Sequence, residues 1–467
     1  MTLPIRSRRW LAALGALTAL FSVSSVGWAQ VAQQQQAGVI VDANGVLAMA
    51  YYNDEGGQLT RQRMVAAKAA LDADVVRKSK LRMVSLTRLE KAVADGRNLT
   101  SEMRYLAGLT RIQYVFFYPD SGDVVLAGPA EGWYSDLSGR IVGLSTGQPV
   151  LELQDLVVAL RAYHPGGDAK QSIGCSIDPT KEGLARLQQF LNSAQGGFSS
   201  QTEAEAQAPA IVEGIRESLG MQQVRFMGVP ATTHFAQVML EADYRMKLIG
   251  IGDPSHDFSR GRLALKSFAQ IADAAAISHK ALNRWWFMPE YQCVRLSEDG
   301  LAIELVGQGV KLVGEDEVVG ADGRRTGTGS TGGASHKFTL GFTKKYPQLA
   351  QVVPVYAQLR NLIDMAIVAA HIQKQDYYNK ADWDLPVFGD EQQFPVETYQ
   401  TPTQVESAVT SFMKQNRLVT PVGGGVRIEA ELALESTNLL PDEDSAVEKA
   451  RSETQLDHLE DGQWWWD

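Results

Sequence analysis

The sequence is poor in the side chains that most often bind metals or form cross-links. It has two cysteines and seven histidines in 467 residues. The cysteines lack C-x-x-C spacing, and no histidines form H-x-x-x-H or H-E-x-x-H. We therefore expect no metal site and no cofactor.

Motifs that bind phosphate or nucleic acid are also missing. The glycine-rich stretch at 320–333 lacks the G-x-x-x-x-G-K-[ST] order of a phosphate-binding loop. Nucleic-acid binding needs a basic surface that displaces counterions from phosphates. The formal charge is −10, and the densest basic run, residues 77–82, is short. We therefore expect no nucleic-acid partner.

The first 29 residues have the three parts of a secretory signal peptide. Arg6, Arg8 and Arg9 precede an apolar run from Trp10 to about Val26, and Gly27-Trp28-Ala29 offers small residues for cleavage after Ala29. The alternative is an uncleaved anchor, but a membrane span needs roughly 20 predominantly apolar residues. This run is shorter and contains serines, so we predict a cleaved, exported bacterial protein, periplasmic or extracellular. The adjacent arginines leave a twin-arginine route open beside the general one.

The mature chain has no second apolar run long enough to span a membrane. The composition of the full sequence, 45% hydrophobic and 21% charged, is that of a globular protein. We expect a mixed α/β (α+β) fold with hairpins, an antiparallel meander at 284–313 and packed helices, divided between two domains. The predicted segments, in chain order, are a signal peptide (1–29), a disordered leader (30–37), an N-terminal α/β domain (38–193), a linker (194–208), a C-terminal α/β domain (209–441) with a mobile glycine-rich loop (316–335), and a disordered acidic tail (442–467).

Much of the acidity lies in the tail. Loss of the three leader arginines takes the formal charge from −10 to −13, and residues 442–467 hold nine acids against Lys449 and Arg451. The tail ends in Trp464-Trp465-Trp466. Exposed aromatic side chains are costly unless something covers them. This end is therefore predicted to be a docking peptide for a protein or envelope partner.

Export bears on the two cysteines, because thiols tend to oxidise outside the cytoplasm. Cys175 and Cys293 allow one pairing. A disulfide requires their Cα atoms to lie within about 7 Å, which sequence does not reveal. A bridge and two buried free thiols both remain open.

Gly143-Leu144-Ser145-Thr146-Gly147 fits the G-x-S-x-G pattern of a nucleophile elbow. That motif requires a strand before the serine and a helix directly after it. Pro149 and two apolar residues follow instead. A hairpin turn is therefore the favoured interpretation, and Ser145 is a weak catalytic candidate.

The best polar group lies on a predicted helix after residue 230. On a helix, His234, Glu241 and Arg245 share one face at i, i+7 and i+11. A histidine between a carboxylate and an arginine suits acid–base chemistry or anion binding. Asp243 and Lys247 complete the candidate set with His234 and Arg245. The alternative is an amphipathic helix whose polar side faces solvent.

Several distinctive strings occur in the mature chain, at residues 126–133, 175–180, 226–230, 234–247, 284–289 and 307–312. With them the chain resembles an uncharacterised family of exported planctomycete-type bacterial proteins, known only as a domain of unknown function, over roughly Gly38 to Trp383. The resemblance implies export and one shared architecture, and it supplies no catalytic residues. We expect a binding or scaffolding protein of the cell envelope; the alternative is a secreted hydrolase that uses Ser145 or the His234 region.

Overall fold

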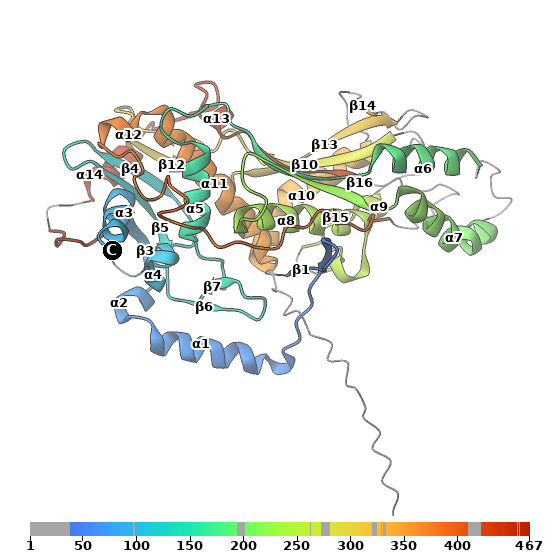
Figure 1. Ribbon diagram of the computed structural model, residues 1–467, viewed down its shortest axis with the longest axis horizontal. Helices are drawn as coiled ribbons and strands as arrows, with labels where there is room; N and C mark the ends of the chain where they lie inside the picture. The colour runs from blue at the N-terminus through green and yellow to red at the C-terminus, as the bar shows by residue number, and fades with distance from the viewer. Residues whose placement is uncertain are drawn as a thin grey trace, which may run out of the picture. The chain divides into compact units, whose positions relative to one another are not determined.

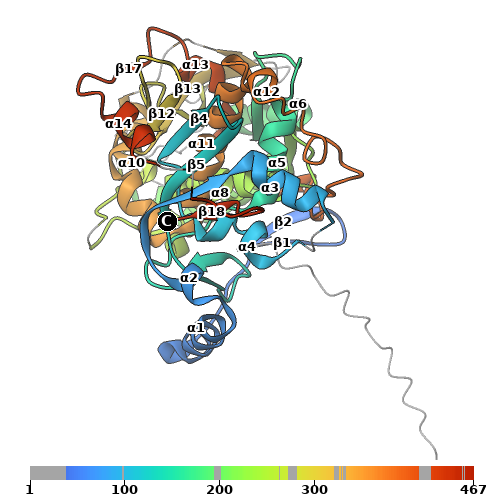
Figure 2. The same ribbon diagram turned by 90° about the vertical axis from the view of Figure 1, so that its left-hand side faces the viewer.

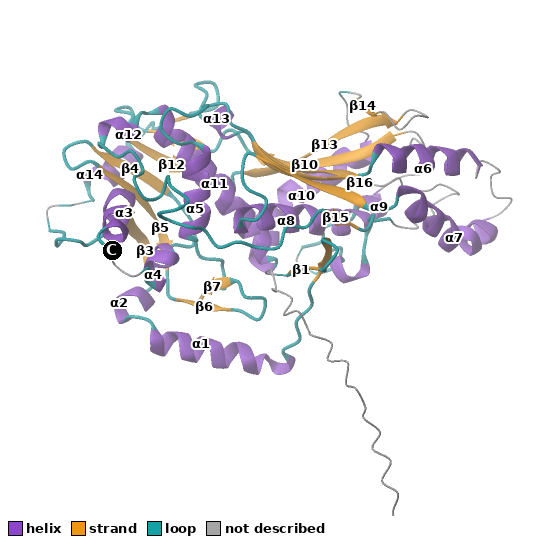
Figure 3. Cartoon of the chain, in the orientation of Figure 1, coloured by secondary structure: helices purple, strands orange, loops and turns teal. Residues whose placement is uncertain are grey.

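Two large β-sheets and the helices packed on them make up most of the described chain, as Figures 1 and 3 show. This computed structural model describes residues 38–96, 99–193, 201–261, 263–271, 281–319, 325–327, 329, 333–409, 422–454, 456 and 458–467. The predicted signal peptide and leader lie outside these residues. The mixed α/β class predicted from the sequence is confirmed.

The larger sheet has nine strands among the described residues, and most neighbours are antiparallel. In spatial order they are β1 (Val39–Val41), β2 (Val46–Met49), β15 (Gln404–Val405), β9 (Gln222–Met227), β8 (Ile173–Asp178), β16 (Val422–Ile428), β10 (Ala281–Pro289), β13 (Val310–Val319) and β14 (Arg325–Gly327). A hairpin turn at Asn44-Gly45 joins β1 to β2, and Gly45 has the positive φ, 76°, that such a turn favours.

The smaller sheet has seven strands in the described part of the chain. In spatial order they are β17 (Leu440–Pro441), β11 (Val294–Leu296), β12 (Ala302–Leu305), β4 (Tyr114–Tyr118), β5 (Asp123–Ala130), β3 (Ser79–Ser85) and β18 (Trp465–Trp466). A separate hairpin consists of β6 (Trp133–Ser135) and β7 (Ile141–Gly143).

Both sheets cross the domain boundary predicted at residues 194–208. Strand β8, from before that boundary, pairs with β9 and β16 from after it, and β4 pairs with β12. The described residues from Gly38 onward belong to one compact unit. Residues 194–200 lie outside the described part of the chain, while residues 201–208 begin helix α7 (Gln201–Leu219). The linker prediction was wrong there because small and polar residues suggest a linker even where alanine and glutamate favour a helix.

The strands predicted between residues 284 and 313 form, but not as one antiparallel meander. Strands β10 and β13 pair in the larger sheet, whereas β11 and β12, which lie between them in sequence, pair in the smaller sheet. The predicted mobile loop at 316–335 is also partly regular, since β13 continues to Val319 and pairs with β14. Local turn residues predict that strands reverse, but not which sheet each one joins.

Three helices form the centre of the molecule: α5 (Leu153–Ala162), α8 (His234–Ile251) and α11 (Pro354–Lys374). They pack on one another, and α8 also lies against β8 and β16. In Figure 1, α5 and α11 lie between the smaller sheet on the left and the larger sheet on the right. The Thr233 side chain accepts a hydrogen bond from the Ala236 N–H and so caps the start of α8. His234 is therefore held in the first turn of a buried helix.

The remaining helices surround this centre. They are α1 (Gln58–Ala70), α2 (Ala73–Val76), α3 (Leu86–Ala94), α4 (Ser101–Arg104), α6 (Lys181–Ser193), α9 (Phe268–Ile271), α10 (Gly333–Val352), α12 (Tyr377–Lys380), α13 (Ala430–Ala433) and α14 (Ala446–Ser452).

The described part of the acidic tail is not disordered, which corrects the prediction for residues 442–467. It contains α14 and ends in β18, which pairs with β3 at the edge of the smaller sheet (Figure 2). Trp464 and Trp466 are 7% and 5% exposed. Acidic composition indicated disorder, but burial of these aromatic rings and pairing with an open strand edge hold the end of the chain in place.

No single described helix is long and apolar enough to cross a membrane. Helices α10 and α11 reach that length and hydropathy only as a pair bent by 110°. Residues 355–372 of α11 are buried within the protein.

Candidate functional site

Helix α8 divides the predicted polar residues between two opposite faces. At 100° per residue, Glu241 and Arg245 lie within about 20° of His234, whereas Asp243 and Lys247 lie about 140–180° away. The structure brings Glu241 and Arg245 together, with Arg245 Nε 2.7 Å from Glu241 Oε1. The four residues His234, Asp243, Arg245 and Lys247 therefore do not converge on one site.

Asp243 and Lys247 form a buried ion pair between α8 and the larger sheet. Lys247 Nζ donates to Asp243 Oδ2 at 2.8 Å, to the Ile177 carbonyl at 3.0 Å and to the Gly424 carbonyl at 3.2 Å. Burial raises the pKa of Asp243 to about 6 although Lys247 opposes it. The pair joins the helix to β8 and β16, so its role is structural.

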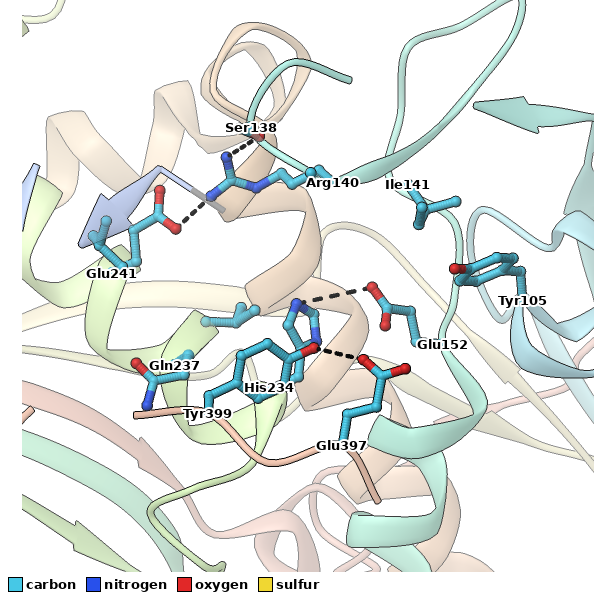
Figure 4. A pocket seen from close by; sticks show the side chains of 13 residues that line it. Tyr105, Ser138, Arg140, Ile141, Glu152, His234, Gln237, Glu241, Glu397 and Tyr399 are labelled. Carbon is cyan, nitrogen blue, oxygen red and sulfur yellow. Dashed lines mark hydrogen bonds and ion pairs between the residues drawn. The ribbon is translucent and has the colours of Figure 1, made fainter. Parts of the chain in front are cut away.

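A cavity of about 160 Å³ opens beside the first turns of α8. Its walls come from β1, the β6–β7 hairpin, the start of α5, α8 and the segment around residue 398. The polar side chains that line it include those of Tyr105, Arg140, Glu152, His234, Gln237, Glu241, Glu397 and Tyr399 (Figure 4). Of the predicted site residues, His234 lines this cavity.

Two carboxylates face the two nitrogens of the His234 ring. Nδ1 lies 2.8 Å from Asp155 Oδ2, and Nε2 lies 3.8 Å from Glu152 Oε1. Both acids come from the start of α5, where Glu152 precedes the helix and Asp155 is in its first turn. Asp155 therefore orients the ring, and the Nε2 edge faces Glu152 at the cavity wall.

Burial and these contacts shift the pKa values of His234 and Glu152. Burial alone would lower the pKa of His234, but Asp155 and Glu152 outweigh it and raise that pKa to about 10. Burial raises the pKa of Glu152, against the opposing charge of His234. In the ligand-free chain the ring is therefore an imidazolium at neutral pH. A perturbed base beside a perturbed acid at a cavity is typical of a functional site.

The opposite wall of the cavity is a closed polar network around Arg140. Its Nε donates to Gln358 Oε1 at 2.7 Å, its Nη1 to Ser138 Oγ at 3.3 Å, and its Nη2 to Glu241 Oε2. Gly38 packs against this network with φ of 98°, and a Cβ there would lie 2.6 Å from Glu241 Oε1. The network is tightly packed, and the single carboxylate of Glu241 pairs with both Arg140 and Arg245.

Tyr399 and Glu397 stand at the outer side of the cavity. Tyr399 Oη donates to Glu397 Oε2 at 3.2 Å, and its ring centroid is 5.9 Å from that of His234. Figure 4 shows Glu397 directed toward Tyr399 and Glu152 directed toward His234. Burial, followed by the charge of Glu152, raises the pKa of Tyr399, so its hydroxyl stays protonated.

Ser145 does not form a nucleophile elbow. It lies in the exposed turn after β7, where its N–H donates to Glu131 Oε2 at 2.9 Å and the Thr146 N–H donates to Glu131 Oε1 at 3.0 Å. The next helix, α5, begins at Leu153. The hairpin turn was the correct interpretation, and Glu131 stabilises it.

Cys175 and Cys293 are both buried free thiols, so the candidate disulfide is not formed. Cys175 belongs to β8 of the larger sheet, whereas Cys293 lies one residue before β11 of the smaller sheet. Burial raises the pKa of both thiols, that of Cys293 to about 12. Neither is activated as a thiolate.

No local sequence pattern marks four of the residues at this cavity: Glu152, Asp155, Glu397 and Tyr399. Acids at the start of a helix are common because they favour its dipole, so Glu152 and Asp155 carried no distinctive pattern. Glu397 and Tyr399 lie outside any helix or strand. Suitable ligand atoms of Glu152, Asp155 and His234 all lie within 4.8 Å of one another, a grouping that no spacing motif in the sequence indicates.

The segment that matches a known family contains most of β8 and all of α6, α7, β9 and α8. Residues 175–258 match the model of DUF1598, a protein family of unknown function. This DUF1598 segment contains His234, whereas its partners Glu152, Asp155, Glu397 and Tyr399 lie outside it. The resemblance inferred from the sequence is confirmed as far as a domain of unknown function. No curated protein and no solved structure matches the chain.

Proposed function

We propose that this protein is exported and binds a small, positively charged polar ligand in the His234 cavity. The composition of residues 1–29 supports export. The contact of one imidazole with two carboxylates at the cavity wall supports cation binding. A binding role is the one favoured from the sequence over a hydrolase, and the His234 cavity is the site proposed for it.

The charge balance of the cavity carries this proposal. Around the ring, Glu152 and Asp155 face the single positive charge of His234. Arg140 pairs with neither of these acids, because its guanidinium is directed to Glu241, Gln358 and Ser138 on the opposite wall. The ligand side of His234 is therefore acidic, and an ammonium group or a metal cation is the complementary charge.

Glu397 adds a third carboxylate at the outer side. Its partner Arg104 lies at 3.5 Å, and both side chains are about half exposed or more. Exposed pairs of this kind contribute little and are readily exchanged. Glu397 is thus able to turn from Arg104 toward a bound cation.

Ligand binding is tested by calorimetry and thermal shift on the mature chain from Gln30. The cationic probes are putrescine and ethanolamine, and the matched probes are acetate and glycerol. A ligand that binds only the native state raises the unfolding temperature, and the rise grows with the logarithm of its concentration once that exceeds the Kd. We expect a rise with the cationic probes, loss of the rise in Glu152→Gln, and no change in the exposed control Glu406→Gln.

Two results would contradict ligand binding at this site. One is an equal response to acetate and glycerol, which would show that charge is not recognised. The other is undiminished binding by a folded Glu152→Gln variant, which would place the ligand elsewhere.

Export is tested separately by expressing the full chain in a bacterium and measuring the intact mass of the exported protein. We expect a mature chain that begins at Gln30. Retention of residues 1–29 in the membrane fraction would instead support the uncleaved anchor.

The second candidate is hydrolysis by acid–base chemistry at His234, and the hydrogen bond that His234 Nδ1 donates to Asp155 favours it. A carboxylate that orients a histidine is a recurring part of hydrolytic sites. Turnover of p-nitrophenyl esters that disappears in His234→Gln and persists in Ser145→Ala would support this role over simple binding. Equal turnover in the wild type and in His234→Gln would contradict a hydrolytic role for His234.

A partner for the tail ending Trp464-Trp465-Trp466 remains a prediction. The body of the protein covers two of these rings, so a partner would have to displace β18 from β3. Pull-downs with the full chain and with residues 464–467 deleted test this directly.

A further inference from the structure

The buried polar atoms without a partner around His234 are acceptors. Asp155 Oδ1, Gln237 Oε1 and Gln154 Oε1 have no hydrogen-bond donor among the described residues. Asp155 and Gln237 are each 4% exposed. Buried acceptors without donors are costly. Gln237 lines the cavity, and Gln154 and Asp155 follow Glu152 by two and three residues. The site therefore has more hydrogen-bond acceptors than donors, and a cation or a donor from a ligand would satisfy the acceptors that remain.

The His234 ring is oriented as it is in many metal sites. When Nδ1 carries the proton donated to Asp155, Nε2 presents its lone pair toward Glu152 and the cavity. Zinc binds nitrogen and oxygen at about 2.0–2.2 Å, which puts two tetrahedral ligands about 3.4 Å apart. The observed Nε2–Oε1 separation of 3.8 Å is close to that value. A small movement of the Glu152 side chain would let both atoms hold one ion.

The chemistry of the ligands selects the class of cation. Calcium and magnesium prefer all-oxygen sites, whereas imidazole suits zinc, copper, iron and nickel. The remaining coordination positions would face the 160 Å³ cavity, toward Glu397 and solvent. Such an ion would keep open positions, as catalytic and exchangeable metal sites do.

We propose that Glu152, Asp155 and His234 form a binding site for a divalent transition-metal ion. His234 Nε2 and Glu152 are the ligands. Asp155 is a positioning residue that fixes the ring through Nδ1. The ion replaces the proton on Nε2, and that proton passes to solvent. This assignment rests on the proposed function, because it identifies the small cation that the cavity takes.

The experiment measures Zn²⁺ binding by the mature chain, prepared without a polyhistidine tag and stripped with a chelator. Competition against a zinc-sensitive dye gives stoichiometry and affinity, with Ca²⁺ as the oxygen-preferring comparison. We expect one Zn²⁺ per chain and much weaker binding of Ca²⁺. Glu152→Gln and His234→Gln should each lower zinc affinity at least tenfold. Asp155→Asn should lower it by about 10–100-fold, as loss of a positioning carboxylate does.

The matched control is His164→Gln, which removes an exposed histidine. It should bind zinc as the wild type does, and circular dichroism checks that every variant is folded. Unchanged zinc affinity in folded Glu152→Gln and Asp155→Asn would overturn the proposal and mark the ion as adventitious. If His234→Gln does not fold, these two variants still decide the result.

The two proposals fail in different ways. Binding of putrescine or ethanolamine without zinc binding would overturn the metal site and leave the cation-binding function in place. Binding of neither the amines nor zinc would overturn both. Zinc binding that is lost in Glu152→Gln supports both, and amines that compete with zinc would show that they share the cavity.

Discussion

Arg82 binds the side chain of Asp467, the last residue of the sequence, through two hydrogen bonds. Its Nε and Nη2 lie 2.8 and 2.9 Å from the two carboxylate oxygens, and the Arg82 side chain is fully buried. The same guanidinium donates to the carbonyls of Val75 and Ala107. It also lies 4.7 Å from the centroid of the Trp465 ring. The end of the tail thus neutralises a buried cation of the smaller sheet.

Asp467→Asn should destabilise the protein by about 1–3 kcal/mol, because it leaves a buried guanidinium without its neutralising partner. Urea unfolding of the variant and the wild type measures the difference. Asp444→Asn, an exposed tail acid, is the control and should change the free energy of unfolding little. Equal effects of the two substitutions would show that tail charge in general, not the Arg82 contact, matters.

Lys247→Met should destabilise by about 3–5 kcal/mol, since it leaves the buried Asp243 without its cation. The double variant Asp243→Leu, Lys247→Met should be more stable than this single variant, because it removes both charges. A double-mutant cycle from denaturant unfolding measures the coupling. Additive effects would contradict the buried pair.

Acid stability should depend on His371, whose buried ring lies 3.3 Å from the Tyr377 hydroxyl through Nε2. Burial, aided by Lys374 and Lys380, lowers the pKa of His371 to about 3. The contribution to stability is therefore present above the unfolded pKa and is lost as pH falls. Below about pH 6.5 the His371 ring takes up a proton in the unfolded chain but not in the folded one. The free energy of unfolding therefore falls by about 1.4 kcal/mol for each pH unit until the pKa of the folded state is reached.

His371→Gln should remove the part of the pH dependence of the unfolding free energy that comes from His371, although the substitution lowers stability at neutral pH. Unfolding free energies between pH 4 and 7 measure the slope, with His164→Gln as the exposed control. A slope identical in His371→Gln and wild type would show that other groups dominate acid unfolding.

Both cysteines should be unreactive toward a thiol reagent in the native protein and fully reactive in denaturant without reductant. The reason is that both thiols are free, buried and held protonated. Counting thiols with a chromogenic disulfide reagent gives the result. Two thiols after denaturation are expected, and none would show that the chain is bridged.

The features predicted correctly from the sequence are local. Asn44-Gly45 produces its hairpin because the turn requirement lies within two residues. Helices at 153–162 and 181–193 follow from apolar spacing and helix-start residues. The apolar run at 248–251 would also suit a strand, but it continues α8 to Ile251. Apolar residues at a helix end pack equally well in either form.

Local patterns in the sequence also indicate only part of the candidate site, namely the residues that share one helix. The periodicity of a helix places Glu241 and Arg245 on the His234 face, and the structure confirms the Glu241–Arg245 contact. The residue that orients His234 lies 79 positions earlier in the chain. Nothing in a local pattern marks Asp155 as that partner, and the same holds for Glu397 at the outer side of the cavity.

Local sequence patterns specify the mixed α/β class, the turns at Asn44-Gly45 and Ser145, and the helix that carries His234, because these depend on neighbours a few residues apart. Tertiary structure alone decided which strands share a sheet, that the two cysteines stay apart, and that the tryptophan-rich end is buried. It also decided that Asp155 and Glu152 meet His234 at a cavity. Those outcomes depend on packing between distant segments, where burial of apolar surface and pairing of buried charges outweigh local preference.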